Sequence, residues 1–219
     1  MMTEINLLAT HPAANRDYDK RLAEKTPDII RIAKQFGKEF FDGDRRCGYG
    51  GYQYDGRWKA VARRMKSHYQ LADDCSILDI GCAKGFLLHD FKELLPDCTV
   101  AGIDVSEYAI EQAMPSVKPY LKVASAETLP CPDKSYDLVI SINSIHNLRI
   151  DLLKSALMEI ERVSRKHSYV TVDAWRSAKE RENLYKWVLT AETMMHVDDW
   201  KKLFTEVGYT GDYWWFIAD

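Results

Sequence analysis

The sequence predicts an α/β fold in which helices cover both faces of a mostly parallel sheet. Short apolar runs alternate with helical patterns from about residue 75 onward, and each run is almost continuously apolar. Such alternation is typical of βαβ units. Continuous apolar runs indicate strands that are buried on both faces, as parallel strands are. We therefore expect a three-layer sandwich for this part of the chain.

The periodicity of apolar residues sets the expected elements. Strands are expected at Ser76–Ile80, Thr99–Ile103, Leu121–Ala124, Tyr136–Ile142 and Ser168–Asp173. Helices are expected at Phe86–Leu95, from Ser106 to about Met114, at Asp151–Ser164, and near 177–187 and 198–207. The last apolar run, Asp212–Ile217, is predicted to be an antiparallel edge strand that closes the sheet.

The N-terminal part has a different character, and we predict that residues 1–70 form a helical lid on the domain at 71–219. Thr26-Pro27 predicts a helix start, with Thr as the N-cap and Pro at the first helical position. A second amphipathic helix is expected to start near Asp55. The loop between these helices is rich in glycine and aromatic residues.

Composition excludes several classes of protein. The chain of 219 residues has a net charge of -3, which gives no overall attraction to nucleic acid or to anionic lipid. Its five cysteines form no C-x-x-C pair, so neither a disulfide framework nor a zinc site is expected. No signal peptide and no membrane-spanning apolar run is evident, and we expect a cytoplasmic protein without a bound metal.

A glycine loop follows the first expected strand directly and leads into a helix. It reads Asp79-x-Gly81-x-Ala83-x-Gly85, and its glycines allow the backbone to approach a ligand closely. Asp104 ends the second expected strand, where a carboxylate can accept both ribose hydroxyls of an adenosine group. A dinucleotide fingerprint would need a glycine where Phe86 stands, so the spacing disfavours a dehydrogenase.

This spacing resembles the D/E-x-G-x-G-x-G pattern of class I S-adenosylmethionine (SAM)-dependent methyltransferases, with Ala83 in place of the middle glycine. The resemblance covers about 75–215 and includes the segment after the third strand and the motif of the fourth. It implies a Rossmann-like fold, SAM as cofactor and S-adenosylhomocysteine as product. The cofactor-binding residues that it implies are Asp79, Gly81, Cys82, Ala83, Gly85, Asp104, Val105, Ser125, Ala126, Glu127 and Asn143.

Three residues are candidates for a catalytic role. His146 follows the fourth strand beside the expected sulfonium and is a candidate general base, although a packing role has nearly equal weight. Tyr49 and Tyr52 lie in the glycine-rich loop, which we expect to seal the site; the alternative is a surface turn whose aromatic rings anchor a helix. The neighbouring arginines of this loop are suited to clamp a carboxylate or a phosphate.

The acceptor is expected to contact residues on the same rim. The candidates are Tyr54, Arg57, Trp58, Asn147, Asp173 and Trp175, which could equally cap and pack neighbouring helices. We expect an O or N atom of a small molecule to be methylated by in-line displacement. A peptide or protein acceptor and a SAM-binding module without activity remain the alternatives. No nucleic-acid or membrane partner is expected, and a homodimer is a possible assembly.

Overall fold

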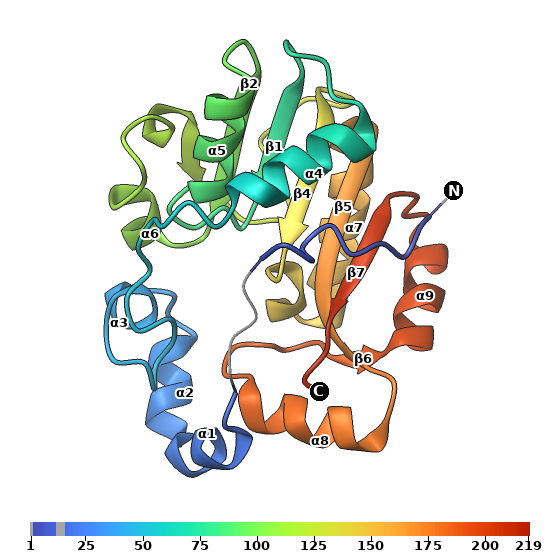
Figure 1. Ribbon diagram of the computed structural model, residues 1–219. Coiled ribbons are helices and arrows are strands. Elements are labelled where there is room, and N and C mark those ends of the chain that lie inside the picture. The colour runs from blue at the N-terminus through green and yellow to red at the C-terminus, as the bar shows by residue number, and fades with distance from the viewer. Residues whose placement is uncertain (1, 12–15) are drawn as a thin grey trace.

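The computed structural model describes residues 2–11 and 16–219, and their strands form one sheet in the middle of three layers (Figure 1). The strand order is β3-β2-β1-β4-β5, with β7 beside β5 and the short β6 continuing along the same edge of β5. The strands are β1 (Ser76–Ile80), β2 (Thr99–Asp104), β3 (Leu121–Val123), β4 (Tyr136–Ile142), β5 (Ser164–Trp175), β6 (Met195–His196) and β7 (Asp212–Phe216).

Helices cover both faces of this sheet because neighbouring strand residues point to opposite sides. On one face, α4 (Lys59–Tyr69) and α5 (Phe86–Leu94) bury Met65 and Phe91 against Ile77. On the other, α7 (Ile150–Val163) and α9 (Val197–Glu206) pack against Leu78 and the inner residues of β5. The predicted three-layer α/β sandwich is confirmed, and its strands fall within a few residues of their expected positions.

The C-terminal strand differs from the prediction, because β7 runs parallel to β5. Tyr169 pairs with Asp212 and Asp173 with Phe216, in a parallel register. After β5 the chain passes through α8 (Ala178–Trp187) and β6. Helix α9 then returns the chain to the end of the sheet at which the strands begin, called here the amino edge. A strand that starts from that edge has to run in the direction of β5. The expected antiparallel orientation was therefore wrong, and the two-residue β6 had no detectable sequence pattern.

The carboxyl ends of the strands meet the N-terminal helices at one edge of the sheet (Figure 1). These are α1 (Tyr18–Glu24), α2 (Pro27–Ala33) and α3 (Lys38–Phe41), of which α2 begins as predicted: the Thr26 side chain accepts a hydrogen bond from the Ile29 amide. α6 (Glu107–Glu111) adjoins the same edge.

The predicted boundary at residue 70 falls after α4, which packs on the sheet, so the part outside the sandwich is α1–α3 with its loops. No helix in the described ranges is long and apolar enough to cross a membrane.

Candidate functional site

The glycine loop connects β1 to α5 at the carboxyl edge of the sheet. Gly81 and Gly85 have φ angles of +77° and +75°, which favour glycine over other residues. A Cβ atom on Gly81 would collide with the side chain of Ser144, and one on Gly85 would lie 2.8 Å from Val117 Cγ2. The loop is therefore packed too closely, on Ser144 after β4 and on Val117 before β3, to accept a side chain at either position.

Two carboxylates stand at this edge on neighbouring strands. The side chain of Asp79 is buried and forms no hydrogen bond or ion pair with any residue in the described ranges. Burial, followed by the charge of Asp104, raises the pKa of Asp79 to about 7. Asp104 accepts hydrogen bonds from the amides of Ala83 (2.8 Å) and Ser106 (2.9 Å), but burial still raises its pKa. An acidic, unpaired cradle of this kind fits a cationic ligand that also carries hydroxyl groups.

The other predicted cofactor residues lie along the ends of β2, β3 and β4. Cys82 and Ala83 are buried in the loop, whereas Val105 is 52% exposed. Ser125 donates a hydrogen bond to Glu127, and Ala126 packs against the apolar core on the α7 and α9 side of the sheet. The side-chain oxygen of Asn143 accepts a 2.9 Å hydrogen bond from Thr171 on β5. The fold thus brings the predicted set to one edge, while the part that each member plays in binding stays a prediction.

A buried ion pair joins the glycine loop to the N-terminal segment. The ammonium group of Lys84, 6% exposed, lies 2.9 and 2.6 Å from the two carboxylate oxygens of Asp42 and donates to the carbonyl of Tyr52 (2.9 Å). Asp42 also accepts the hydroxyl of Tyr108 (2.7 Å) and the amide of Tyr52. Burial alone would raise the pKa of Asp42, but the hydrogen bonds from Lys84 and Tyr108 leave it below its ordinary value. Sequence reasoning missed this pair because Lys84 resembles an ordinary loop residue.

Aromatic rings of the loop before α4 cover the start of α5. The ring of Tyr52 stacks on that of Phe86, with ring centroids 4.8 Å apart and an angle of 18° between the planes. The ring centroid of Tyr49 lies 4.5 Å from that of Tyr52. Phe41 of α3 contacts both tyrosines. Tyr52 is half-buried and Tyr49 is 48% exposed. These rings therefore form a wall above the glycine loop, at the position that a lid would occupy.

His146 and Asp173 form a buried pair at the ends of β4 and β5. The amide of Asp173 donates to Nδ1 of His146 (3.3 Å), and Nε2 lies 3.5 Å from the Asp173 carboxylate. Burial lowers the pKa of His146 and raises that of Asp173, while each partner opposes the shift of the other. Both ring nitrogens of His146 are therefore directed at Asp173, Nδ1 at its amide and Nε2 at its carboxylate.

The predicted acceptor residues are only partly brought together. Asn147 lies beside the pair, and its buried side-chain oxygen has no hydrogen-bond partner within the described part of the chain. Tyr54 instead donates a 2.5 Å hydrogen bond to Asp90 on α5, and Arg57 pairs with the exposed Asp55. The ring of Trp58 lies 4.6 Å from that of His11 at a tilted angle, and Trp175 packs against Arg181 and Tyr185 of α8. These last four residues have structural partners that the sequence did not reveal.

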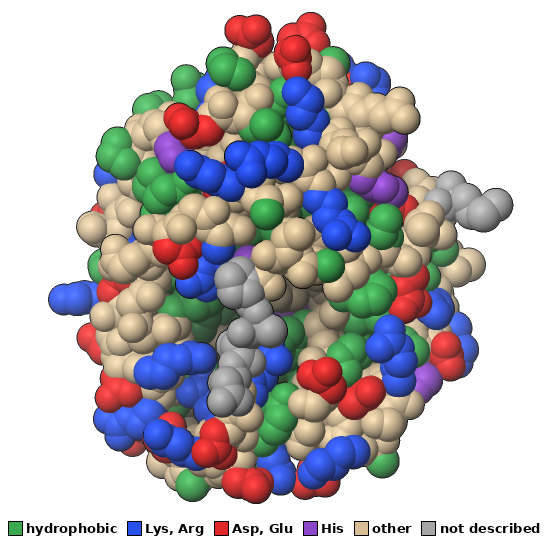
Figure 2. Space-filling model, in the orientation of Figure 1, with side chains coloured by type: hydrophobic (Ala, Val, Ile, Leu, Met, Phe, Trp, Pro, Cys, Tyr) green, Lys and Arg blue, Asp and Glu red, His purple; other side chains and the backbone are tan. Residues whose placement is uncertain are grey.

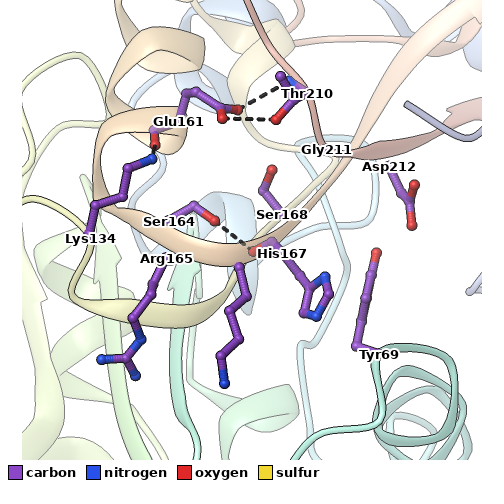
Figure 3. A pocket seen from close by; sticks show the side chains of 11 residues that line it. Tyr69, Lys134, Glu161, Ser164, Arg165, His167, Ser168, Thr210, Gly211 and Asp212 are labelled. Carbon is purple, nitrogen blue, oxygen red and sulfur yellow. Dashed lines mark hydrogen bonds between the residues drawn. The ribbon is translucent and has the colours of Figure 1, made fainter. Parts of the chain in front are cut away.

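A separate pocket lies at the opposite, amino edge of the sheet (Figure 3). It has a volume of about 230 Å³ and is lined by the start of β5 and β7 and by Tyr69. Several of its polar groups bind one another: Glu161 accepts from Thr210, and Lys134 donates to the Glu161 carbonyl. Buried oxygens without a hydrogen-bond partner in the described residues occur at both edges, on Tyr69 in this pocket and on Asn147 at the carboxyl edge. The carboxyl edge, which also holds the buried carboxylate of Asp79, is where ligands of parallel sheets bind.

Comparisons with known proteins agree with this geometry. A family model described as a methyltransferase domain matches residues 71–208, more than half of the chain. The chain belongs to the class I, Rossmann-like methyltransferases. S-adenosylmethionine is the cofactor of this family, and the unpaired Asp79 beside Asp104 fits its cationic amino-acid part and its ribose. Within the described ranges, no cluster of three metal-ligating side chains occurs.

Individual relatives match parts of this methyltransferase. An uncharacterized protein of Haemophilus influenzae is 25% identical over 63% of the chain, and a malonyl-[acyl-carrier protein] O-methyltransferase of Hahella chejuensis is 37% identical over 39%. The matches span 59% and 32% of those two proteins. A solved SAM-dependent methyltransferase from Archaeoglobus fulgidus superposes with a TM-score of 0.53 at 21% identity, covering 69% of this chain and 68% of the other. This last likeness concerns the fold.

The ion pair between Lys84 and Asp42 yields a prediction on stability. Lys84→Met leaves the carboxylate of Asp42 partly buried without its cation, so we expect a loss of about 3 kcal/mol in the free energy of unfolding. Lys66→Met is the matched control: it removes the exposed pair with Asp73 and should change that free energy by less than about 1 kcal/mol. Urea denaturation measures both. Equal effects of the two substitutions would contradict a special role for the buried pair.

Proposed function

We propose that this methyltransferase transfers the methyl group of SAM to an oxygen or nitrogen atom of a small acceptor. The observation that carries the proposal is Asp79, a buried carboxylate without a partner at the carboxyl end of β1. A buried acid is normally paired or neutralised. A cationic ligand at this edge would supply the missing partner, and SAM carries both an ammonium and a sulfonium group.

The residues of the chain would bind and orient this cofactor. When bound, SAM supplies an electrophilic methyl group for in-line attack. Asp79 would hold the ammonium group, and Asp104 the ribose hydroxyls, since its carboxylate is already fixed by the amides of Ala83 and Ser106. The wall formed by Tyr49 and Tyr52 would exclude water above the loop. We therefore assign the lid function to the N-terminal segment as far as Trp58.

On the acceptor side, Asp173 would receive the proton that the acceptor loses, and His146 would position it. The pKa of Asp173 is raised by burial, which makes its carboxylate a better base than an exposed one. Asn147 offers an unpartnered oxygen that could accept a hydrogen bond from the acceptor. The O-methyltransferase among the relatives supports an oxygen acceptor for this chain as well.

Calorimetry with SAM at several pH values tests the cofactor site. SAM should bind to the wild type, and the affinity should fall as the pH drops below about 7, because Asp79 then becomes protonated. Asp79→Asn should weaken binding at least about tenfold through loss of a charge-assisted contact. The same variant should melt at a higher temperature than the wild type at pH 8, because it no longer buries a charge.

The two readouts separate a binding defect from misfolding. A variant that is more stable and yet binds SAM poorly has lost a ligand contact and has kept its fold. No SAM binding by the wild type at any pH would refute the proposed function. Unchanged affinity in Asp79→Asn would refute the role of that carboxylate alone.

Turnover tests the proton acceptor. Acceptors are first identified by transfer of radiolabel from methyl-labelled SAM to a panel of hydroxy and amino compounds. Asp173→Asn should then lower kcat by about a hundredfold, as loss of a general base does, with little change in SAM affinity. His146→Gln should have a smaller effect and should shift the pH profile, because it acts through Asp173. If both variants keep kcat within a few-fold of wild type, no base is needed and positioning suffices.

A further inference from the structure

Three arginine side chains converge on one tryptophan near the carboxyl edge of the sheet. The guanidinium carbons of Arg16, Arg21 and Arg45 lie 5.6, 5.5 and 5.6 Å from the centre of the Trp187 ring. Arg16 precedes α1, Arg21 belongs to α1, Arg45 lies in the glycine-rich loop and Trp187 ends α8. Segments that are distant in the sequence thus place three positive charges around one indole. We call these four residues the arginine cluster.

No guanidinium of the arginine cluster is paired with a carboxylate of the described residues. The nearby acids have other partners: Asp44 pairs with Arg46 at 2.8 Å, and Asp19 with Lys186 at 2.7 Å. Of the three arginines in the glycine-rich segment, Arg46 and Arg57 are therefore neutralised by exposed aspartates, and Arg45 is not. The guanidinium of Arg45 donates a hydrogen bond to the carbonyl of Gly48.

Arg21 and Arg16 differ in how far their donors are used. Arg21 is buried and donates to the carbonyls of Trp187 (3.2 Å), Arg45 (3.2 Å) and Arg46 (2.9 Å), so it holds the cluster together. Arg16 stacks on Phe216 at 4.6 Å, and its Nε atom is buried without a hydrogen-bond partner in the described part of the chain. An unsatisfied buried donor on a cation indicates that an acceptor is missing.

The arginine cluster adjoins the acceptor side of the site. Phe216, beneath Arg16, pairs with Asp173 across β7 and β5. The charge of Arg16 also acts on Asp173, where it opposes the effect of burial on the pKa of that carboxyl. Figure 2 shows Lys and Arg side chains gathered below the central hollow of this face, over the region of α1–α3 in Figure 1.

Packing alone does not explain three unneutralised cations at one indole. A cation–π contact contributes about 0.5–2 kcal/mol, but like charges that are brought together repel one another. This repulsion is felt within the cluster, since burial and then the charge of Arg45 lower the pKa of Arg21. A bound oxyanion would remove the repulsion and satisfy the free donors, because guanidinium groups match carboxylate and phosphate geometry.

We propose that Arg16 and Arg45, held in place by Arg21 and Trp187, bind an oxyanion of the methyl acceptor, a carboxylate or a phosphate group. The acceptor is then an anionic small molecule whose charged end lies on the arginine cluster and whose reactive atom faces Asp173. This inference rests on the proposed methyl transfer for the identity of the ligand. The binding of an anion by the cluster can be measured without any turnover.

The test is calorimetry with inorganic phosphate and with acetate at constant ionic strength, in the presence and absence of S-adenosylhomocysteine. The wild type should bind one of the two anions at one site. Arg16→Gln/Arg45→Gln should weaken this binding at least about tenfold, because two charge-assisted contacts are lost. Arg16→Lys/Arg45→Lys should retain part of it. A preference for phosphate or for acetate identifies the oxyanion.

Two controls make the outcome decisive. Arg63→Gln removes an exposed arginine of α4, and its anion affinity should equal that of the wild type. S-adenosylhomocysteine affinity should be the same in all the variants, which shows that each is folded. Absence of saturable anion binding by the wild type, or equal binding by the double Gln variant, overturns the proposal. If the anion binds but S-adenosylhomocysteine does not, the methyl-transfer proposal fails and the anion site stands.

Discussion

The ion pair between Lys84 and Asp42 fixes the N-terminal segment to the cofactor edge of the sheet. It adds a charged contact to the stacking of Tyr52 on Phe86, and the two together hold the loop that carries Tyr49 and Tyr52 above the glycine loop. Asp42 accepts hydrogen bonds from Lys84, from Tyr108 and from the amide of Tyr52. One carboxylate thus connects the glycine loop, α6 and the loop before α4. A fully partnered buried pair of this kind favours one arrangement over many, since any other leaves a charge unpaired.

Around this fixed point, the carboxyl edge divides into two electrostatic halves. The half at the carboxyl ends of β1 and β2 holds Asp79 and Asp104 and is acidic, which suits a cationic cofactor. The half near α1, α8 and β7 holds three arginines without carboxylate partners, which suits an anionic acceptor. The His146–Asp173 pair stands at the ends of β4 and β5, between these halves in the strand order. This separation would orient donor and acceptor toward each other.

Much of the fold and of the cofactor edge was predictable, because both depend on local patterns. Continuous apolar runs marked the strands, and strand ends placed Asp79 and Asp104 at the same edge on the neighbouring strands β1 and β2. Contacts between distant segments left no such pattern. The partner of Lys84 lies 42 residues earlier in the chain, and Arg16 and Trp187 meet only through folding. The direction of β7 depended on the return path of α9, and the role of Tyr54 depended on its distant partner Asp90.

Hydrogen–deuterium exchange on the full chain, with and without S-adenosylhomocysteine, tests the central claim most directly. If the N-terminal segment closes over the cofactor through Asp42, the ligand should slow exchange both at the glycine loop 81–85 and at residues 42–54. In Lys84→Met, the ligand should still protect the glycine loop, while the protection of 42–54 should be lost. Protection of the glycine loop alone in the wild type would contradict the account, because the segment would then not cover the site.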